Sequence, residues 1–201
     1  MGTRYFGLKT KDIKDGLLLG EANCGDLQSH IDGDNSTIDD ALRGKWCLQI
    51  AQDVAYVHER GIFHSNLGTT NVLVHQTSTT DLILADFGGS RCSELELDGG
   101  LIPDDPCFDP HLTDFTSPKV DLFSLGIVIY IIVTGHYPFY QSPAPQNEER
   151  FVYGARVRKL FDQGKFPDLS SVRFGGVVAG CCYERRFETA KEVVVALEAE
   201  I

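Results

Sequence analysis

The chain has 201 residues, of which 42% are hydrophobic, enough for one domain with a buried core. Its 18 basic and 29 acidic residues give a net charge of -11, which argues against a surface that binds the nucleic-acid backbone. The six cysteines form no CxxC pair or zinc-type cluster, so we expect reduced thiols and a cytoplasmic location. We expect neither a nucleic-acid partner, because of the charge, nor a membrane partner.

The first residues contain two candidate strands. The stretches "RYFGLKT" and "GLLLGEA" are apolar enough for β-strands, and the charged turn "KDIKDG" separates them. Two strands alone are marginally stable in water, and an uncovered sheet edge invites pairing with another chain. We therefore expect self-association, or binding of a protein partner, through residues 4–20.

A long amphipathic helix follows. Ser36, with Asp39 three residues on, predicts its start, and Gly61 predicts its end. Short apolar runs at 71–74 and 82–85, separated by a Thr/Ser turn, then predict a small hairpin.

Residues 121–135 are hydrophobic on every side, which predicts a helix buried in the middle of a helical body. Their uncharged run is too short to span a bilayer, which needs about 20 residues. Further helices are predicted at about 148–163, 171–182 and 188–200. The predicted fold class is therefore α+β and mainly α.

Two motifs lie between these elements. Residues 64–71 read "HSNLGTTN", and Asp86-Phe87-Gly88 follow in "LILADFGGS". In this order, and with "KVDLFSLG" opening the buried helix, the chain from about residue 4 to its end resembles the C-terminal lobe of a eukaryotic protein kinase. The resemblance implies residual strands and a hinge of a truncated N-terminal lobe at 1–22, and the helical lobe at 23–201. The motif "HSNLGTTN" and the ending "CCYERRFETAKEV" are similar to those of divergent fungal kinase-like proteins.

The resemblance places an amide where active kinases have their base. Their loop reads H-R-D-L-x-x-x-N, in which Asp accepts the substrate proton and Asn holds a magnesium ion. Asn66 lies five residues before Asn71 and so occupies the Asp position. An amide there removes general-base catalysis, which contributes about 100- to 10,000-fold to the reaction rate. From the residue type itself, the alternative role of Asn66 is to hydrogen-bond the turn backbone. Ser65 and Gly68 replace an Arg and a Lys of the same loop.

The implied cofactors are ATP and Mg²⁺, with weak or absent binding, because no GxGxxG motif is present to cover the phosphates. Asn71 and Asp86 match the two metal ligands, and both offer the hard oxygen atoms that suit Mg²⁺. The alternative is that Asp86 only shapes its turn and Asn71 only caps a strand. The implied nucleotide contacts are Glu21 and Asn23 for adenine, Asp26 for ribose, and Leu73 under the ring. Counting forward to Glu21 makes Gly20 the gatekeeper residue, whereas counting back from Asp26 makes it Leu19.

Residues that would hold such a lobe together are also matched. The resemblance implies that Asp121 accepts hydrogen bonds from the loop backbone and that Asp109 pairs with Arg186. It implies that Phe87 and His64 stack in a hydrophobic column, although both fit an ordinary core equally well. The segment from Gly88 to Asp109 corresponds to the activation segment, and the expected cationic partner for its phosphorylation is replaced by Ser65.

Three hypotheses follow for the function. The first is a kinase-fold remnant without phosphotransfer activity, a pseudokinase that acts as a binding module. The second is a fragment of an intact ATP-dependent Ser/Thr or Tyr protein kinase, with the N-terminal lobe missing from the gene prediction. The third is an active enzyme with a displaced base.

Overall fold

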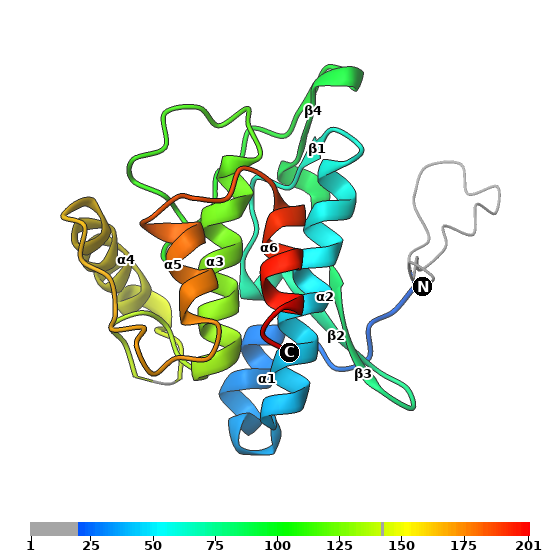
Figure 1. Cartoon of the computed structure of the whole chain (residues 1–201), viewed down its shortest axis with the longest axis vertical. Helices are drawn as coiled ribbons and strands as arrows, with labels where there is room; N and C mark the ends of the chain where they lie inside the picture. Colours follow the sequence, from blue (N-terminus) through cyan, green and yellow to red (C-terminus); the bar gives the residue numbers. More distant parts are fainter. Residues whose placement is uncertain (1–19, 142) are drawn as a thin grey trace.

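Two long helices form the centre of the molecule. In the computed structural model, which describes residues 20–141 and 143–201, α2 spans Asp40–His58 and α3 spans Lys119–Thr134. They lie against each other, and other elements surround α3 (Figure 1). The prediction of a buried helix at 121–135 is confirmed, because nearly all of α3 is buried.

The start of α2 differs from the prediction. The helix begins at Asp40 rather than near Ser36, because the carboxylate of Asp39 caps it by accepting a hydrogen bond from the Leu42 amide at 2.8 Å. The preceding residues, Asn35–Thr37, form a separate 3-10 turn. The end of α2 lies three residues before Gly61, close to the predicted stop.

One helix was not predicted. The short α1 spans Leu27–Asp34, and the side chain of Asp26 caps it by accepting from the Ser29 amide at 2.9 Å. Its eight residues are mostly polar and include Gly33, so neither an apolar run nor a periodic pattern marks it in the sequence.

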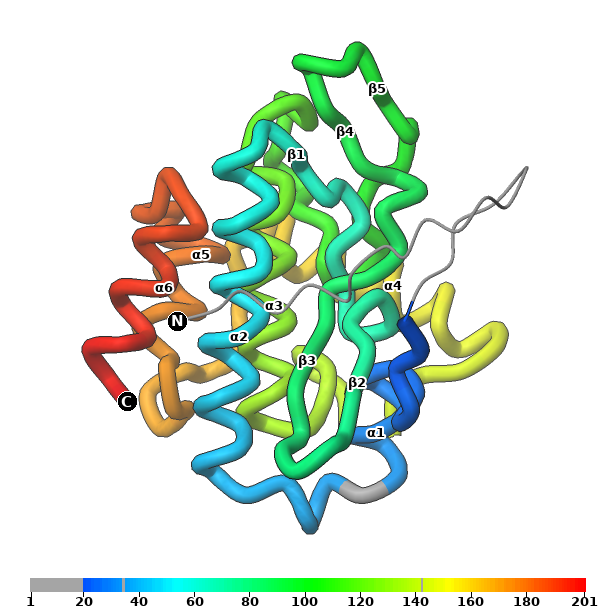
Figure 2. Tube along the Cα trace, turned by 90° about the vertical axis from the view of Figure 1, so that its right-hand side faces the viewer, coloured from blue at the N-terminus to red at the C-terminus, as the bar shows by residue number. Residues whose placement is uncertain are grey.

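The predicted hairpin is confirmed. Strands β2 (Val72–Gln76) and β3 (Thr80–Leu84) pair antiparallel, with Leu73 opposite Ile83. The hairpin lies beside α2 in Figure 2, and β3 is the strand that packs on this helix. Its open end brings residues before β2 next to residues after β3, which assembles the candidate site.

A second, smaller sheet was not predicted. It contains β1 (Ile62–Phe63), β4 (Arg91–Cys92) and β5 (Leu97–Asp98) in the order β1-β4-β5, all antiparallel. Strands of two residues are too short to give a periodic signal. The loop between β4 and β5 forms a ribbon that extends from one end of the molecule (Figures 1 and 2).

The three C-terminal helices occur close to the predicted positions. Helix α4 spans Asn147–Asp162, α5 spans Gly175–Cys182, and α6 spans Ala190–Glu198. Helix α5 packs on α3, and α6 packs on α2. Thr189 caps α6 in a reciprocal pair with Glu192.

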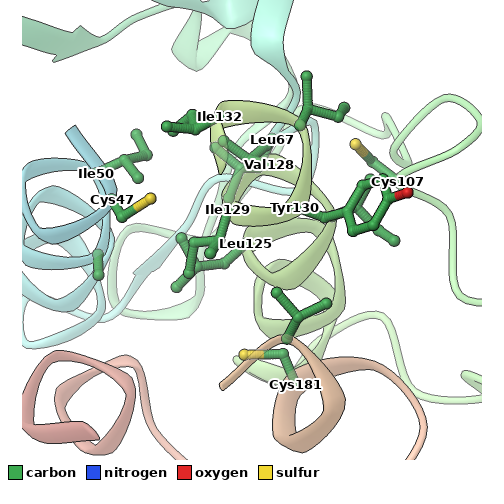
Figure 3. Packing of buried hydrophobic residues seen from close by; sticks show 14 of the residues in the cluster. Cys47, Ile50, Leu67, Cys107, Leu125, Val128, Ile129, Tyr130, Ile132 and Cys181 are labelled. Carbon is green, nitrogen blue, oxygen red and sulfur yellow. The ribbon is translucent and has the colours of Figure 1, made fainter. Parts of the chain in front are cut away.

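One continuous hydrophobic core joins these layers. Figure 3 shows Cys47 and Ile50 of α2 beside Leu125 and Ile129 of α3, all fully or almost fully buried. At Gly126 the backbones of α3 and α5 approach so closely that an added Cβ would lie 2.5 Å from the Cβ of Cys181. This glycine therefore sets the spacing of the two helices.

The predicted strand pair at 4–20 lies outside the described residues except for Gly20, so the division at residue 22 stays a prediction. Within the described part of the chain, no helix is long and apolar enough to cross a membrane.

Candidate functional site

The loop that starts at His64 is held from the first turn of α3. Asp121 is fully buried there, and its two carboxylate oxygens accept hydrogen bonds from the backbone amides of His64 at 2.7 Å and Ser65 at 2.8 Å. Ser65 adopts a left-handed conformation with φ of 61°, a geometry that costs energy for a residue other than glycine. The predicted role of Asp121 is confirmed, since hydrogen bonds to a buried carboxylate fix the shape of the loop.

His58 is a member of this network that the sequence reasoning missed. It lies in the last turn of α2, and its ring Nε2 is 2.9 Å from the carboxylate of Asp121. Its other ring nitrogen, Nδ1, is buried and has no hydrogen-bond partner among the described residues. Because the carboxylate is an acceptor, Nε2 carries the donated proton. The only sequence signal was a histidine six residues before His64 in "YVHERGIFH".

Asn66 lies half-buried in the loop, and it uses its backbone to stabilise the turn. Its amide nitrogen is 3.4 Å from Nδ1 of His64, and its carbonyl accepts from the side chain of Asn71 at 2.8 Å. Among the described residues its side-chain amide forms no hydrogen bond, so the alternative role, a side-chain hydrogen bond to the turn backbone, is not seen. Asn66 instead lines a cavity of about 240 Å³ between the loop and residues 104–107.

The open end of the β2–β3 hairpin brings the two candidate metal ligands to the same edge. The amide of Ala85 donates to the carbonyl of Asn71 at 2.9 Å, so Asp86 directly follows this contact. The Asn71 side-chain nitrogen is bound to Asn66, which leaves its amide oxygen as the atom that can bind a cation. Asp86 is exposed, has φ of 57°, and accepts from the Gly88 amide at 3.3 Å.

These donors fit Mg²⁺ in kind, because both are hard oxygen ligands, but they are few. No group of three His, Cys, Asp or Glu side chains in the described part of the chain could hold a metal. A magnesium ion at Asn71 and Asp86 would therefore need phosphate oxygens and water for its remaining coordination positions. Their roles as metal ligands stay predictions.

His64 and Phe87 meet as the resemblance implied. Their rings are 5.0 Å apart in an edge-on arrangement, and Nε2 of His64 lies 2.8 Å from the carbonyl of Ala85. His64 is completely buried, whereas Phe87 is 43% exposed. An ordinary core position therefore describes His64 but not Phe87.

Of the four predicted nucleotide contacts, Leu73 belongs to β2, and Asn23 and Asp26 lie beside this strand. The side chain of Asn23 pairs with the backbone of Gln76 in both directions, at 2.9 Å and 2.8 Å. Asp26 lies opposite Leu73, which is partly exposed, and Glu21 is exposed further along the linker. The linker thus runs beside β2 like a third strand.

The carboxylate of Asp26 already has a structural task. It accepts from both the backbone amide and the hydroxyl of Ser29, at 2.9 Å and 2.7 Å. A ribose hydroxyl would have to share this carboxylate with the start of α1. The nucleotide roles of Glu21, Asn23, Asp26 and Leu73 stay predictions.

The predicted pair of Asp109 with Arg186 is wrong by one residue. Asp109 is almost fully buried, and its carboxylate is 2.8 Å from the guanidinium of Arg185. Arg186 instead donates to the carbonyl of Gly176 and lies 3.3 Å from Glu184. The reason is local, since Arg185 adopts a left-handed conformation with φ of 49° after α5, which turns its side chain toward Asp109.

The activation segment contains its own cation. Arg91 in β4 pairs with Asp98 in β5 at 2.9 Å and donates to the carbonyl of Phe115 at 2.6 Å. The hydroxyl of Ser90 donates to the carbonyl of His64 at 3.2 Å, which connects the segment to the loop. The resemblance placed the expected cation at position 65, so Arg91 was not predicted as a partner of this segment.

Comparisons with known proteins point to one family. The protein kinase domain family matches residues 9–192. The chain is 34% identical over 119 residues to the serine/threonine-protein kinase kin-29 of Caenorhabditis briggsae. The aligned region covers 57% of this chain and 14% of that protein. It is 34% identical over 126 residues to Aurora kinase B of Drosophila melanogaster, and this aligned region covers 61% of the chain and 38% of that protein.

A solved structure has the same fold. The crystal structure of the Rad53 kinase domain and SCD2 superposes with a TM-score of 0.65 at 19% identity, covering 89% of this chain and 64% of that one. The kinase-like, mainly helical fold is therefore established. The matches cover only 12% to 38% of the lengths of the curated relatives.

Proposed function

We infer that the chain, which belongs to the protein kinase domain family, is a catalytically inactive member that serves as a protein-binding module. The observation that carries this proposal is the amide of Asn66 in a loop that Asp121 otherwise holds in an ordered shape. An amide cannot accept the proton of an attacking hydroxyl near neutral pH. The contacts that maintain the loop are thus retained, and the proton acceptor is not.

Neighbouring groups offer no evident replacement for the base. Cys107 lines the same cavity as Asn66, but burial raises the pKa of its thiol to about 12, so the thiol stays protonated at neutral pH. Asp104 and Asp105 also line this cavity, and each is paired with an arginine, Arg150 or Arg158. These pairings argue against an active enzyme with a displaced base.

Binding of Mg²⁺ and ATP is proposed to be weak. Asn71 and Asp86 are the residues that would hold the ion, whose charge would offset that of the nucleotide phosphates. Among residues 20–141 and 143–201 these are the two candidate protein ligands, and the sequence has no Gly-rich phosphate loop.

The proposal is tested by assaying the purified chain for phosphotransfer from ATP to generic protein substrates. We expect no transfer above a control without enzyme, and the Asn66→Asp variant should not restore it, since positioning and charge neutralisation supply most of the rate in this chemistry. ATP-dependent phosphorylation that disappears in Asp86→Ala would show that the chain is an active kinase.

The second candidate is a fragment of an intact Ser/Thr or Tyr protein kinase. The partial exposure of Phe87 beside the buried His64 favours it, because a further lobe could cover this ring. An upstream reading frame that encodes a Gly-rich loop and a Val-Ala-x-Lys strand would support this candidate and argue against the first.

For the binding module, residues 4–20 are the proposed surface for self-association or for a protein partner. Light scattering on the full chain and on a version that starts at Glu21 tests this. A full-length chain that stays monomeric at tens of micromolar would contradict it.

A cytoplasmic location is proposed as well, in keeping with six free cysteines. Divergent fungal-type pseudokinases are the subgroup to which we propose the chain belongs.

A further inference from the structure

Side chains of α2 bind along the edge of the β2–β3 hairpin. Strand β3 pairs with β2 on one side and packs on α2 on the other (Figure 2). Four helical residues rise about 6.0 Å and two strand residues about 6.6 to 6.8 Å, so side chains four apart on α2 match alternate residues of β3. The three hydrogen bonds that we name the α2–β3 ladder are those of Lys45 with the Thr80 carbonyl at 2.8 Å, Gln49 with the Leu82 amide at 3.2 Å, and Asp53 with the Leu84 amide at 3.4 Å.

The ladder is weaker at the open end of the hairpin than at its closed end. At the closed end, Lys45 also forms an ion pair with Asp81 at 2.7 Å, and Gln49 donates to the same carboxylate at 2.9 Å. At the open end, the 3.4 Å contact with the Leu84 amide is the one hydrogen bond of the Asp53 carboxylate among the described residues. We name this contact the joint. A local separation of α2 from β3 therefore begins most easily at the joint.

The charge of Asp53 decides how firmly the joint is held. Burial raises the pKa of this carboxyl to about 6, and the hydrogen bond from Leu84 opposes the shift. An ionised carboxylate at this position loses most of its hydration, so ionisation favours a separation that admits water. The neutral acid carries no such cost and stays between the helix and the strand.

The charged side chains on the elements that pack against α2 are either paired with this helix or exposed. Asp81 of β3 pairs with Lys45, and Asp121 of α3 pairs with His58. The exposed side chains are Lys119 of α3 and Lys191, Glu192 and Glu198 of α6. The pKa shift of Asp53 accordingly arises from burial, and no charge in the described part of the chain contributes to it.

We propose that Asp53 is a proton-operated switch, whose protonated side chain closes the joint between α2 and the open end of the β2–β3 hairpin and whose ionised side chain loosens it. The joint leads directly into the candidate functional site, because Ala85 follows Leu84. The Ala85 amide donates to the carbonyl of Asn71 at 2.9 Å, and its carbonyl lies 2.8 Å from Nε2 of His64. Acid thus holds this edge of the site firmly, and neutral pH loosens it, whether or not the chain transfers phosphate.

Residue-resolved amide hydrogen exchange of the full-length chain near pH 5 and near pH 7.5 tests the switch. Protection factors correct for the intrinsic effect of pH on exchange. Those of the Leu84 and Ala85 amides should fall about tenfold toward the higher pH, because the pKa of Asp53 is about 6 in the closed joint and returns toward the usual 3.8 in the open one. In Asp53→Asn, whose side chain keeps an acceptor oxygen but cannot ionise, this fall should disappear.

Two comparisons separate the joint from unfolding of the whole domain. The buried amides of α3 exchange when the domain unfolds, so those of Leu84 and Ala85 should be protected about tenfold less and respond little to low concentrations of urea. Asp162→Asn, which removes an exposed carboxylate on α4, should leave the tenfold fall unchanged. Protection at Leu84 and Ala85 equal to that in α3, no fall with pH, or a fall that persists in Asp53→Asn would each overturn the proposal.

Discussion

At the scale of single residues, the pair of Asp109 and Arg185 shows which contacts could be predicted from the sequence and which could not. The resemblance to the kinase family implied a contact between Asp109 and Arg186, and Asp109 does contact an arginine after α5, Arg185. Which of two neighbouring arginines makes it depends on one left-handed φ angle at Arg185, and no residue pattern encodes that angle. Asp121 was predictable because its partners are backbone amides, which are present whatever the loop sequence.

Removing Arg185 should destabilise the domain. Within the described part of the chain, Arg185→Ala leaves the almost fully buried carboxylate of Asp109 with the His111 amide, at 2.9 Å, as its one hydrogen-bond donor. Breaking a fully buried pair costs about 3 to 5 kcal/mol, but Arg185 is 42% exposed, so we expect about 1 to 3 kcal/mol in the free energy of unfolding. Urea denaturation measures it. Lys191→Ala, an exposed control, should change stability by less than about 0.5 kcal/mol, and equal losses in the two variants would contradict the assignment.

Asp53 gives a prediction for the dependence of stability on pH. Burial against the hairpin raises the pKa of this carboxyl to about 6, opposed only by a hydrogen bond from the Leu84 amide at 3.4 Å. Because the folded pKa lies above the usual 3.8, the folded state binds the proton more tightly, and this group adds stability as the pH falls from about 7 toward 4.

Asp53→Asn should therefore raise the free energy of unfolding by about 1 to 3 kcal/mol near pH 7.5, and the gain should shrink near pH 5, where the wild-type carboxyl is already protonated in the fold. Urea denaturation at the two pH values checks this. Asp162→Asn, at an exposed position on α4, serves as the control. A gain of the same size at both pH values would assign the effect to packing rather than to charge.

At the scale of elements, the length and the apolar content of each element together decided whether the sequence predicted it. The long helices α2, α3 and α4 and the β2–β3 hairpin carry enough periodic positions to be recognised. Helix α1 has eight mostly polar residues, and the strands β1, β4 and β5 have two residues each, so neither an apolar run nor a periodic pattern marks them. Helix α5 is as short as α1 but mostly apolar, and it was predicted. The ribbon of the activation segment was missed because its strands are so short, and with it the role of Arg91.

The close approach of α3 and α5 can be tested at Gly126. An alanine there would place its Cβ 2.5 Å from the Cβ of Cys181, an atom that cannot move without its backbone. We expect Gly126→Ala to destabilise the domain by about 1 to 3 kcal/mol, even though alanine favours the helical state. Gly176→Ala in α5 is the control, because the nearest atom is 3.8 Å away and belongs to a flexible arginine. It should be neutral or stabilising by up to about 1 kcal/mol, and thermal melts of both variants compare them.

At the scale of the whole molecule, the order of motifs predicted the kinase-like lobe, and the family match and the solved fold agree. The state of the candidate nucleotide site could not be predicted in the same way. Whether Asp26 and Asn23 are available depends on hydrogen bonds to Ser29 and Gln76 that arise only in the folded chain. Sequence spacing identifies which residues share an edge, whereas folding determines which of their atoms are already engaged.

The melting temperature in the presence of Mg-ATP follows from these contacts. A ligand stabilises the native state by RT ln(1 + [L]/Kd), about 2.7 kcal/mol at a hundredfold excess over Kd. With two candidate metal ligands, we expect millimolar Mg-ATP to shift the melting temperature little or not at all. Differential scanning fluorimetry on the wild type and on Asp86→Ala measures this. A rise of several degrees that Asp86→Ala abolishes would show that the remaining residues form an effective site.

The distribution of the cysteines makes each part of the molecule separately observable. A thiol is alkylated only when it is exposed and ionised, and burial raises the pKa of Cys47, Cys107, Cys181 and Cys182. Cys181 and Cys182 can react only when α3 and α5 separate, whereas Cys92, buried in the ribbon, can react when the ribbon alone opens. Half-buried Cys24 should be labelled first. Residue-resolved alkylation rates therefore report how often the ribbon opens relative to complete unfolding, without any introduced probe.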